Sequence, residues 1–321
     1  LNTFDDRHQN VVIANYYRQD FIWPGYTAQL SFHFNRDQPS FKFDENDFLV
    51  RPDPAGVFQP HEVNAYYIGW TGDGHINRLN ISHAFYWVLG EDELNPIAGR
   101  YQHINAQMAA AELSYDRDWM RFRTSFFWAS GDDDPTDDAA EGFDSIFDNP
   151  NFAGGEFGFW NRNAVRLTGS GVGLVQGGSL YNTLRSSKLE GNPSFVNPGL
   201  LLLGAGWDAQ LTPKLKVITN ASHLWFDDTA PIEYVLGQGK LGSAIGWDLS
   251  AGVIWCLAFA LFYAPLHFVT TQAALAHLGV RTDVHTIVDL GCGTGVCSAA
   301  WALRHETPPP VSGVDGHPWA L

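Results

Sequence analysis

Residues 26–36 read Tyr-Thr-Ala-Gln-Leu-Ser-Phe-His-Phe-Asn-Arg, and apolar and polar side chains alternate along this stretch. Successive side chains of a β-strand point to opposite faces of a sheet, so the pattern predicts a strand with one apolar and one polar face. The same alternation recurs in 119–129, 199–211 and 243–255. Weaker versions predict strands at about 9–19, 62–71, 75–89, 104–115, 163–170, 172–181 and 213–226.

The connections between the predicted strands alternate between short and long. Short ones fall at Trp23-Pro24-Gly25, Gly72-Asp73-Gly74, Asp116-Arg117-Asp118, Gly169-Ser170-Gly171 and Thr212-Pro213, and long ones at about 37–61, 90–103, 131–162, 182–198 and 227–242. Outer-membrane barrels have this asymmetry, with short periplasmic turns and long external loops. We therefore expect an all-β fold, an antiparallel transmembrane β-barrel over residues 1–254. The sequence predicts about eleven strands, whereas bacterial barrels normally have an even number, so the barrel would be incomplete. A soluble β-protein is the alternative.

The two faces of the predicted strands differ in chemistry. One face is apolar and suits contact with lipid, and we expect it to carry Leu30, Phe32, Phe122, Phe126, Leu203 and Trp247. Aromatic residues near strand ends would form girdles at the membrane interfaces: Tyr26, Tyr115, Trp119, Trp128, Trp225 and Trp255. The other face suits a water-filled lumen, and its charged members are candidate pore-lining residues: Arg78, Glu112, Arg121, Arg123, Lys214 and Lys216. These charges either select solutes or pair with one another and stiffen the wall.

Composition narrows the classes of function. The chain has 321 residues and a formal net charge of −16, which argues against nucleic-acid binding. It begins at Leu1 without a basic and apolar leader, so we expect a signal peptide to be removed or not included. The run 132–138 holds five aspartates, but it lacks the spacing of a calcium-binding loop. We expect a solvated outer loop there and no metal site.

Three loop phrases carry a family resemblance. The acidic loop is followed by Gly-Phe-Asp-Ser-Ile-Phe-Asp-Asn-Pro-Asn-Phe at 142–152, and Phe-Val-Asn-Pro-Gly stands at 195–199. Together with Leu-Arg-Ser-Ser-Lys at 184–188, these phrases resemble outer-membrane porins of the alginate-export type. The resemblance covers residues 1 to about 254. It implies passive export or uptake of a polar or anionic solute, and a place in the outer membrane.

The last part of the chain has a different character. All three cysteines lie there, at Cys256, Cys292 and Cys297, and residues 286–295 read Thr-Ile-Val-Asp-Leu-Gly-Cys-Gly-Thr-Gly. An apolar strand, a glycine loop and a helix-prone stretch at 296–304 are typical of a nucleotide-binding βαβ unit. A second predicted strand at 311–315 ends in Asp315, an acid placed to accept hydrogen bonds from ribose hydroxyls.

This segment resembles the start of class I S-adenosylmethionine-dependent methyltransferases, with 262–279 as the preceding helix. The resemblance implies that the cofactor site comprises Asp289, Gly291, Gly293, Gly295 and Asp315. We expect this site to be vestigial, because the later strands and catalytic residues of the family are missing. Residues 255–321 are therefore interpreted as a truncated α/β segment of Rossmann-like fold.

The sequence predicts an outer-membrane, porin-like channel for polar or anionic solutes or polysaccharide, with outer-membrane lipid as its surroundings. Neither catalytic activity nor a functional cofactor is expected. The alternatives are a methyltransferase fragment and a structural barrel that does not transport. We also expect a hybrid chain, with a junction between about Val253 and Phe262, because the alternation stops at Trp255 without a turn. The competing possibility is a genuine fusion in which 257–266 form a twelfth strand.

Overall fold

The computed structural model describes residues 9–38, 46, 59–146, 152–153, 157–158, 193–212, 214–255, 264–277, 286–290, 296–303 and 309–314. The chain divides into two compact units, Leu1–Asp208 with Ile218–Ala251, and Ala209–Val217 with Gly252–Leu321. Each unit is described by itself. No helix in the described part of the chain is long and apolar enough to span a membrane.

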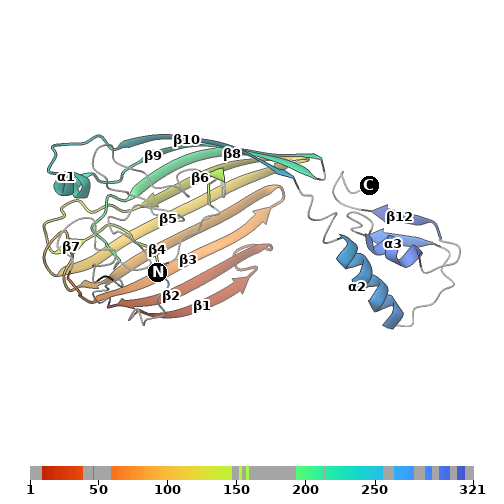
Figure 1. The fold of residues 1–321 in the computed structure, drawn as a ribbon, viewed down its shortest axis with the longest axis horizontal. Coiled ribbons are helices and arrows are strands. Elements are labelled where there is room, and N and C mark those ends of the chain that lie inside the picture. Colours follow the sequence, from red (N-terminus) through yellow and green to blue (C-terminus); the bar gives the residue numbers. More distant parts are fainter. Residues whose placement is uncertain are drawn as a thin grey trace. The chain divides into compact units, whose positions relative to one another are not determined.

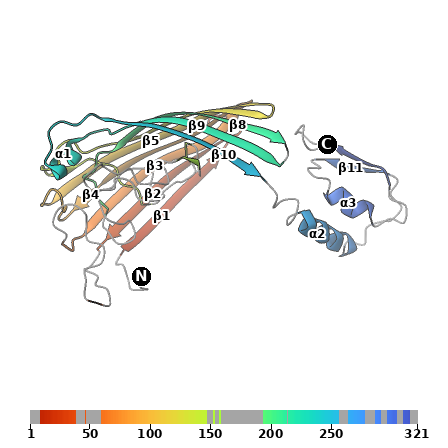
Figure 2. The same cartoon turned by 45° about the horizontal axis from the view of Figure 1, so that its top comes forward.

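A large antiparallel sheet dominates the structure (Figures 1 and 2). Its strands follow one another in chain order: β1 (Gln9–Gln19), β2 (Tyr26–Asp37), β3 (Val63–Ile76), β4 (Leu79–Asp92), β5 (Gln102–Arg117), β6 (Met120–Ala129), β8 (Leu200–Thr212), β9 (Leu215–Trp225) and β10 (Ala244–Trp255). The short β7 (Ala139–Ala140) pairs in parallel with β5. The prediction of an all-β, antiparallel first part is confirmed, and the sheet is not closed within the described residues.

The predicted hairpin at 163–181 lies outside the described residues. In the described sheet, β6 is hydrogen-bonded directly to β8. The parity of the connections survives, because the segment 130–199 leaves and re-enters the sheet at the same end as the other long loops. Nine strands and the short β7 therefore replace the expected eleven in the described sheet.

The predicted turn at Gly72-Asp73-Gly74 is wrong. These residues lie inside β3, and the chain turns instead at Asn77, whose φ of 54° is left-handed. Asparagine is among the few residues other than glycine that tolerate this conformation. The glycine at position 72 serves packing, because a Cβ there would lie 2.3 Å from the hydroxyl oxygen of Tyr26.

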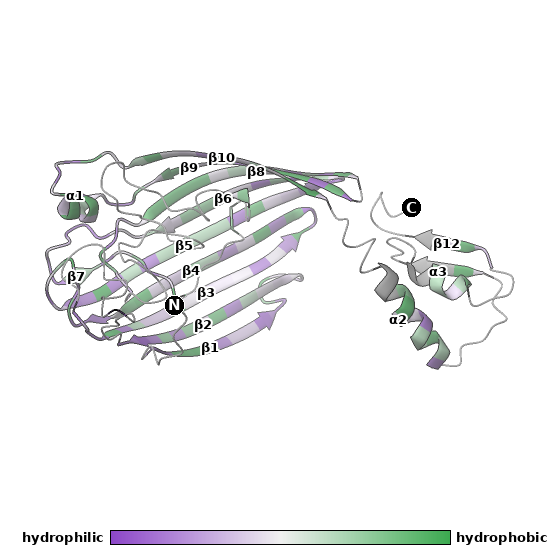
Figure 3. Cartoon of the chain, viewed as in Figure 1, coloured by the Kyte–Doolittle hydropathy of each residue, from purple (hydrophilic) through white to green (hydrophobic). Residues whose placement is uncertain are grey.

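The outer face of the sheet is apolar and exposed. We define it as the face that carries Leu30, and alternate residues along each strand share it (Figure 3). The residues predicted to lie on this face are all exposed: Leu30, Phe32, Phe122, Phe126, Leu203 and Trp247. Among the predicted girdle residues, Tyr115, Trp119 and Trp255 are exposed, whereas Tyr26 is buried beside Trp23 and His83.

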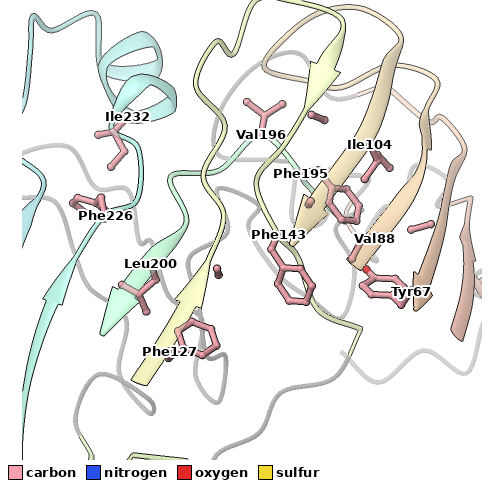
Figure 4. Close-up of a cluster of buried hydrophobic side chains, with 14 of the residues drawn as sticks. Tyr67, Val88, Ile104, Phe127, Phe143, Phe195, Val196, Leu200, Phe226 and Ile232 are labelled. Carbon is pink, nitrogen blue, oxygen red and sulfur yellow. The ribbon is translucent and has the colours of Figure 1, made fainter. Parts of the chain in front are cut away.

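The opposite, inner face has two chemically different halves. Near the short turns it is polar, as predicted. Near the long loops it is covered by loop residues and forms an apolar core that the sequence did not predict (Figure 4). Phe143, Phe195 and Val196 from the loops pack there with wall residues such as Phe127 and Leu200. The helix α1 (Ala230–Leu236) in the loop after β9 contributes Ile232 to this core.

The second unit contains a separate small α/β arrangement. Its elements are α2 (Ala264–His277), β11 (Ile287–Leu290), α3 (Val296–Ala302) and β12 (Val311–Val314). Strands β11 and β12 pair in parallel, with α3 between them in the chain. The positions of these elements agree with those predicted for the tail. Because α2 begins at Ala264, residues 264–266 belong to a helix and not to a twelfth strand.

Candidate channel surface

Arg123 lies at the centre of the polar half of the inner face. Its Nη2 donates to Asp208 Oδ1 at 2.8 Å and to Asn220 Oδ1 at 2.7 Å, and its Nη1 lies 3.9 Å from Glu112 Oε2. Ser125 Oγ donates to the same Glu112 oxygen at 2.8 Å. We call these five residues the Arg123 cluster. It joins side chains from β5, β6, β8 and β9, because inward-facing positions of neighbouring strands lie in rows across a sheet.

Glycine on β8 makes room for this cluster. A Cβ at Gly206 would lie 2.8 Å from Arg123 Nη2 and 3.0 Å from Asn220 Oδ1. At Gly204, a Cβ would lie 2.6 Å from Ser222 Oγ. The small residues that indicated a watery lumen in the sequence therefore have a packing role as well, because they let the long Arg123 side chain lie across β8.

The other predicted pore-lining residues are arranged less tightly. Arg121 Nε donates to Asp116 Oδ1 at 2.5 Å, and this pair is exposed. Arg78 lies exposed in the turn between β3 and β4 and not on a strand. Lys214 is exposed in the turn after β8, and Lys216 is half-buried in β9. Arg121 and Arg123 on β6 therefore both pair with carboxylates, which agrees with the interpretation that charges on this face pair with one another and stiffen the wall. That any of these residues lines a conducting path stays a prediction.

Two of the three loop phrases that carried the family resemblance, 142–152 and 195–199, meet on the inner face. The Gly142 amide donates to the Phe195 carbonyl oxygen at 2.7 Å, and the Asn197 side-chain amide donates to the Phe143 carbonyl oxygen at 3.2 Å. The Ser194 amide donates to Asp144 Oδ2 at 3.0 Å. These bonds hold two distant segments together over the sheet. The phrase at 184–188 lies outside the described residues.

The acidic loop is not wholly solvated, and this corrects the sequence-based expectation. Asp132 is buried, and its Oδ2 accepts from the Glu141 amide at 3.2 Å; within the part of the chain that the structure describes, its Oδ1 has no hydrogen-bond partner. Burial raises the pKa of Asp132 to about 7, and the charges of Asp137, Glu141 and Asp133 act in the same direction. No group of three or more potential metal ligands occurs in the part of the chain that the structure describes.

A buried His–Asp contact at the loop end was not predicted. His61 Nε2 lies 3.3 Å from Asp92 Oδ1, and the Asn95 side-chain amide donates to Asp92 Oδ2 at 3.2 Å. Asp92 ends β4, whereas His61 belongs to the long loop before β3. The alternation predicted a strand that ends near residue 89, so Asp92 fell in the long connection after it, and no local signal connects a loop histidine with it.

The predicted cofactor residues in the tail are described only in part. The backbone of Asp289 lies in β11, the first strand of the parallel pair. Gly291, Gly293, Gly295 and Asp315 lie outside the described residues. The tail thus has the predicted order of strand, helix and strand, and the cofactor site itself stays a prediction.

No family model and no curated protein matches the chain. Among solved structures, it is similar to "Outer-membrane expressed OmpT of Vibrio cholerae", at 10% sequence identity and a TM-score of 0.36. The similarity covers 78% of this chain, and the chain spans 57% of the length of that structure. We do not retain the expectation that the chain is not an enzyme.

Proposed function

We propose that residues 9–255 form the wall of an outer-membrane channel for polar solutes. The observation that carries the proposal is the reversed distribution of side chains. Trp247 and Leu249 are exposed, with fractional exposures of 68% and 73%, whereas Arg123 and Asp208 face inward and each keep only 10% of their side-chain surface. A protein that folds in water buries its large apolar side chains and exposes its charges. A barrel wall in lipid does the opposite.

The loop phrases support a constricted channel of the alginate-export kind. They fold over the inner face, where a loop would narrow the path of a solute. The anionic solute implied by the family resemblance has weaker support, because Arg121 and Arg123 already pair with Asp116 and Asp208. We therefore propose a polar solute and do not require it to be anionic.

Adjacent residues of β10 allow a direct test. The side chain of Leu249 is on the outer face, and Ser250 Oγ accepts from Asn220 Nδ2 at 3.2 Å on the inner face. Spin labels would be placed at each position in a cysteine-free background and the chain incorporated into lipid vesicles. We expect dissolved oxygen to relax the label at 249 strongly, and a water-soluble nickel complex to relax the label at 250. Strong nickel relaxation at 249 would place the outer face in water and refute the proposal.

Conductance separates a channel from a second candidate, a structural barrel that does not transport. The apolar core of the loop half favours that candidate, because packed loops exclude water. We expect the chain to produce discrete current steps in planar bilayers. If the spin labels show that the chain inserts into the bilayer but no current steps appear, the structural barrel is favoured.

For the tail, we propose residual affinity for S-adenosylmethionine. The parallel β11–β12 pair with α3 between them in the chain supports it, since this is the order of strand, helix and strand in a nucleotide-binding unit. Equilibrium dialysis of the full chain with labelled S-adenosylmethionine tests the proposal. Replacing Asp289 by Ala should abolish any binding, and equal binding by both proteins would refute it.

A further inference from the structure

A ring-lined cavity lies on the inner face, between the strands and the inward-folded loop. Its volume is about 470 Å³, which lies within the range of small-molecule sites. The rings that line it come from the wall and from the loop: His33, Tyr67, His83, Tyr86, Phe127, Phe143 and Phe152. We call it the aromatic cavity. No residue of the predicted pore-lining set lines it.

The rings of the aromatic cavity are held in place from several sides. Tyr67 and Phe143 meet edge to face with ring centroids 6.3 Å apart, and the Tyr67 hydroxyl donates to the Asp144 carbonyl oxygen at 2.7 Å. Tyr86 lies over Gly69, where a Cβ would stand 2.3 Å from its ring. The missing Cβ thus lets the Tyr86 ring lie along the wall. These contacts indicate a site whose ring faces are preformed.

The polar groups of the aromatic cavity are mostly neutral. Thr71, Ser82 and Ser145 line it, and Asp73 adds one exposed carboxylate. Among the described lining residues there is no lysine or arginine, so an anionic ligand would find no cationic partner. The Nε2 atom of His33 is buried and has no hydrogen-bond partner among the described residues. A buried polar atom of this kind costs free energy until a ligand or a water satisfies it.

We infer that the aromatic cavity binds a neutral saccharide, as a subsite on the path of the solute. A pyranose ring has an apolar face of C–H bonds that stacks on aromatic rings, and its hydroxyl groups both donate and accept hydrogen bonds. The lining matches both properties, with Tyr86 and Phe152 as ring faces and His33 Nε2 as a hydrogen-bonding group. This inference rests on the proposed function and deepens it by naming the class of solute.

The test measures binding of maltose, digalacturonate and choline to the full chain in detergent micelles by isothermal titration calorimetry. We expect maltose to bind, and digalacturonate and choline to bind more weakly or not at all. Replacing Tyr86 by Ala should weaken maltose binding about tenfold, through loss of one stacking face. Replacing the neighbouring Trp87 by Ala should leave binding unchanged, because Trp87 lies exposed on the outer face.

Two further variants keep the inference testable if Tyr86→Ala does not fold. His33→Leu removes the unpartnered nitrogen and should weaken maltose binding about fivefold. Phe152→Ala changes a loop ring outside the strands and should weaken it to a similar degree. No maltose binding, equal binding by wild type and the variants, or tighter binding of choline, which would assign Asp73 and the rings to a cation, would each overturn the inference.

Conductance of the same preparations separates this inference from the proposed function. Maltose carries no charge and therefore carries no current itself. A decrease in single-channel ion current when maltose is added thus shows that maltose occupies the path of the ions. Current steps without maltose binding would overturn the saccharide subsite and leave the channel standing. Maltose binding without current steps would overturn the channel and leave a binding site.

Discussion

The two halves of the inner face use the same strands in different ways. Near the short turns, the Arg123 cluster fills the face with hydrogen-bonded charge. Near the long loops, Phe143 and Phe195 cover the same strands with an apolar core. Alternation along a strand decides which side chains point inward, but it does not decide whether water or another segment meets them. The loop half should therefore depend on packing, and the turn half on charge.

Truncating the loop core should have the largest effect. Phe195 is fully buried, and Phe195→Ala should lower the free energy of unfolding by about 3–5 kcal/mol, since it removes apolar contacts and leaves a cavity. Urea unfolding in micelles, followed by tryptophan fluorescence, measures the change. The control is Phe126→Ala on the outer face, for which we expect a clearly smaller loss. Equal losses would mean that the loops do not form a core.

The second prediction concerns pH and the loop half. Burial raises the pKa of Asp132 to about 7 from an ordinary value of 3.8, so the folded chain holds a proton that the unfolded chain has already released. The contribution of protonated Asp132 to stability is complete below about pH 4. It falls as the pH rises and is lost above about pH 7. The shift corresponds to a loss of about 4 kcal/mol across that window.

Asp132→Asn should remove this slope, because the amide does not titrate. Urea midpoints at several pH values between 4 and 8 would show it. The control is Asp134→Asn in the same loop: hydrogen bonds from Thr136 lower the pKa of Asp134, so this acid cannot cause a loss of stability with rising pH. If wild type and Asp132→Asn have the same slope, Asp132 is ionised and solvated, as the sequence suggested.

The third prediction turns to the polar half. Arg123→Met removes the hydrogen bonds to Asp208 and Asn220 and should cost about 3 kcal/mol, as expected when one partner of a buried ion pair is lost. Arg121→Met removes the exposed pair with Asp116 and should cost less than about 1 kcal/mol. Urea unfolding measures both. Reversal potentials should move toward cation preference if either arginine lines the path, and unchanged potentials would assign both arginines to the wall alone.

The strands were predictable because their information is local. Leu30 and Ser31 differ in burial as the alternation requires, and the outer face follows from the same rule. The turn at Asn77 was missed because Gly72 and Gly74, which look like turn residues, pack against Tyr26. A glycine kept for close packing and a glycine kept for a turn look the same in a sequence.

The site was less predictable than the fold, because its contacts join distant segments. Alternation placed Arg123 and Glu112 on one face, but it did not predict the hydrogen bonds from Arg123 to Asp208 and Asn220. The packing of Phe143 and Phe195 over the sheet has no periodic signal at all. Loop residues have no fixed direction until the chain has folded, so their contacts appear only in the structure.

A small effect should come from Gly206→Ala, which tests the need for space in the polar half without removing a charge. A Cβ there would lie 2.8 Å from Arg123 Nη2, so the flexible end of that side chain would have to move, at a cost of about 1 kcal/mol. Because every charge remains, unfolding should change little while the hydrogen bonds from Arg123 to Asp208 and Asn220 are displaced. The control is Gly239→Ala in the loop between α1 and β10, where an added Cβ would meet no atom within 4 Å. If Arg123 faces the conducting path, Gly206→Ala should alter the reversal potential and Gly239→Ala should not. If the two variants behave alike in both measurements, the glycine on β8 is not needed to place Arg123, and its small size reflects only a weakly packed wall.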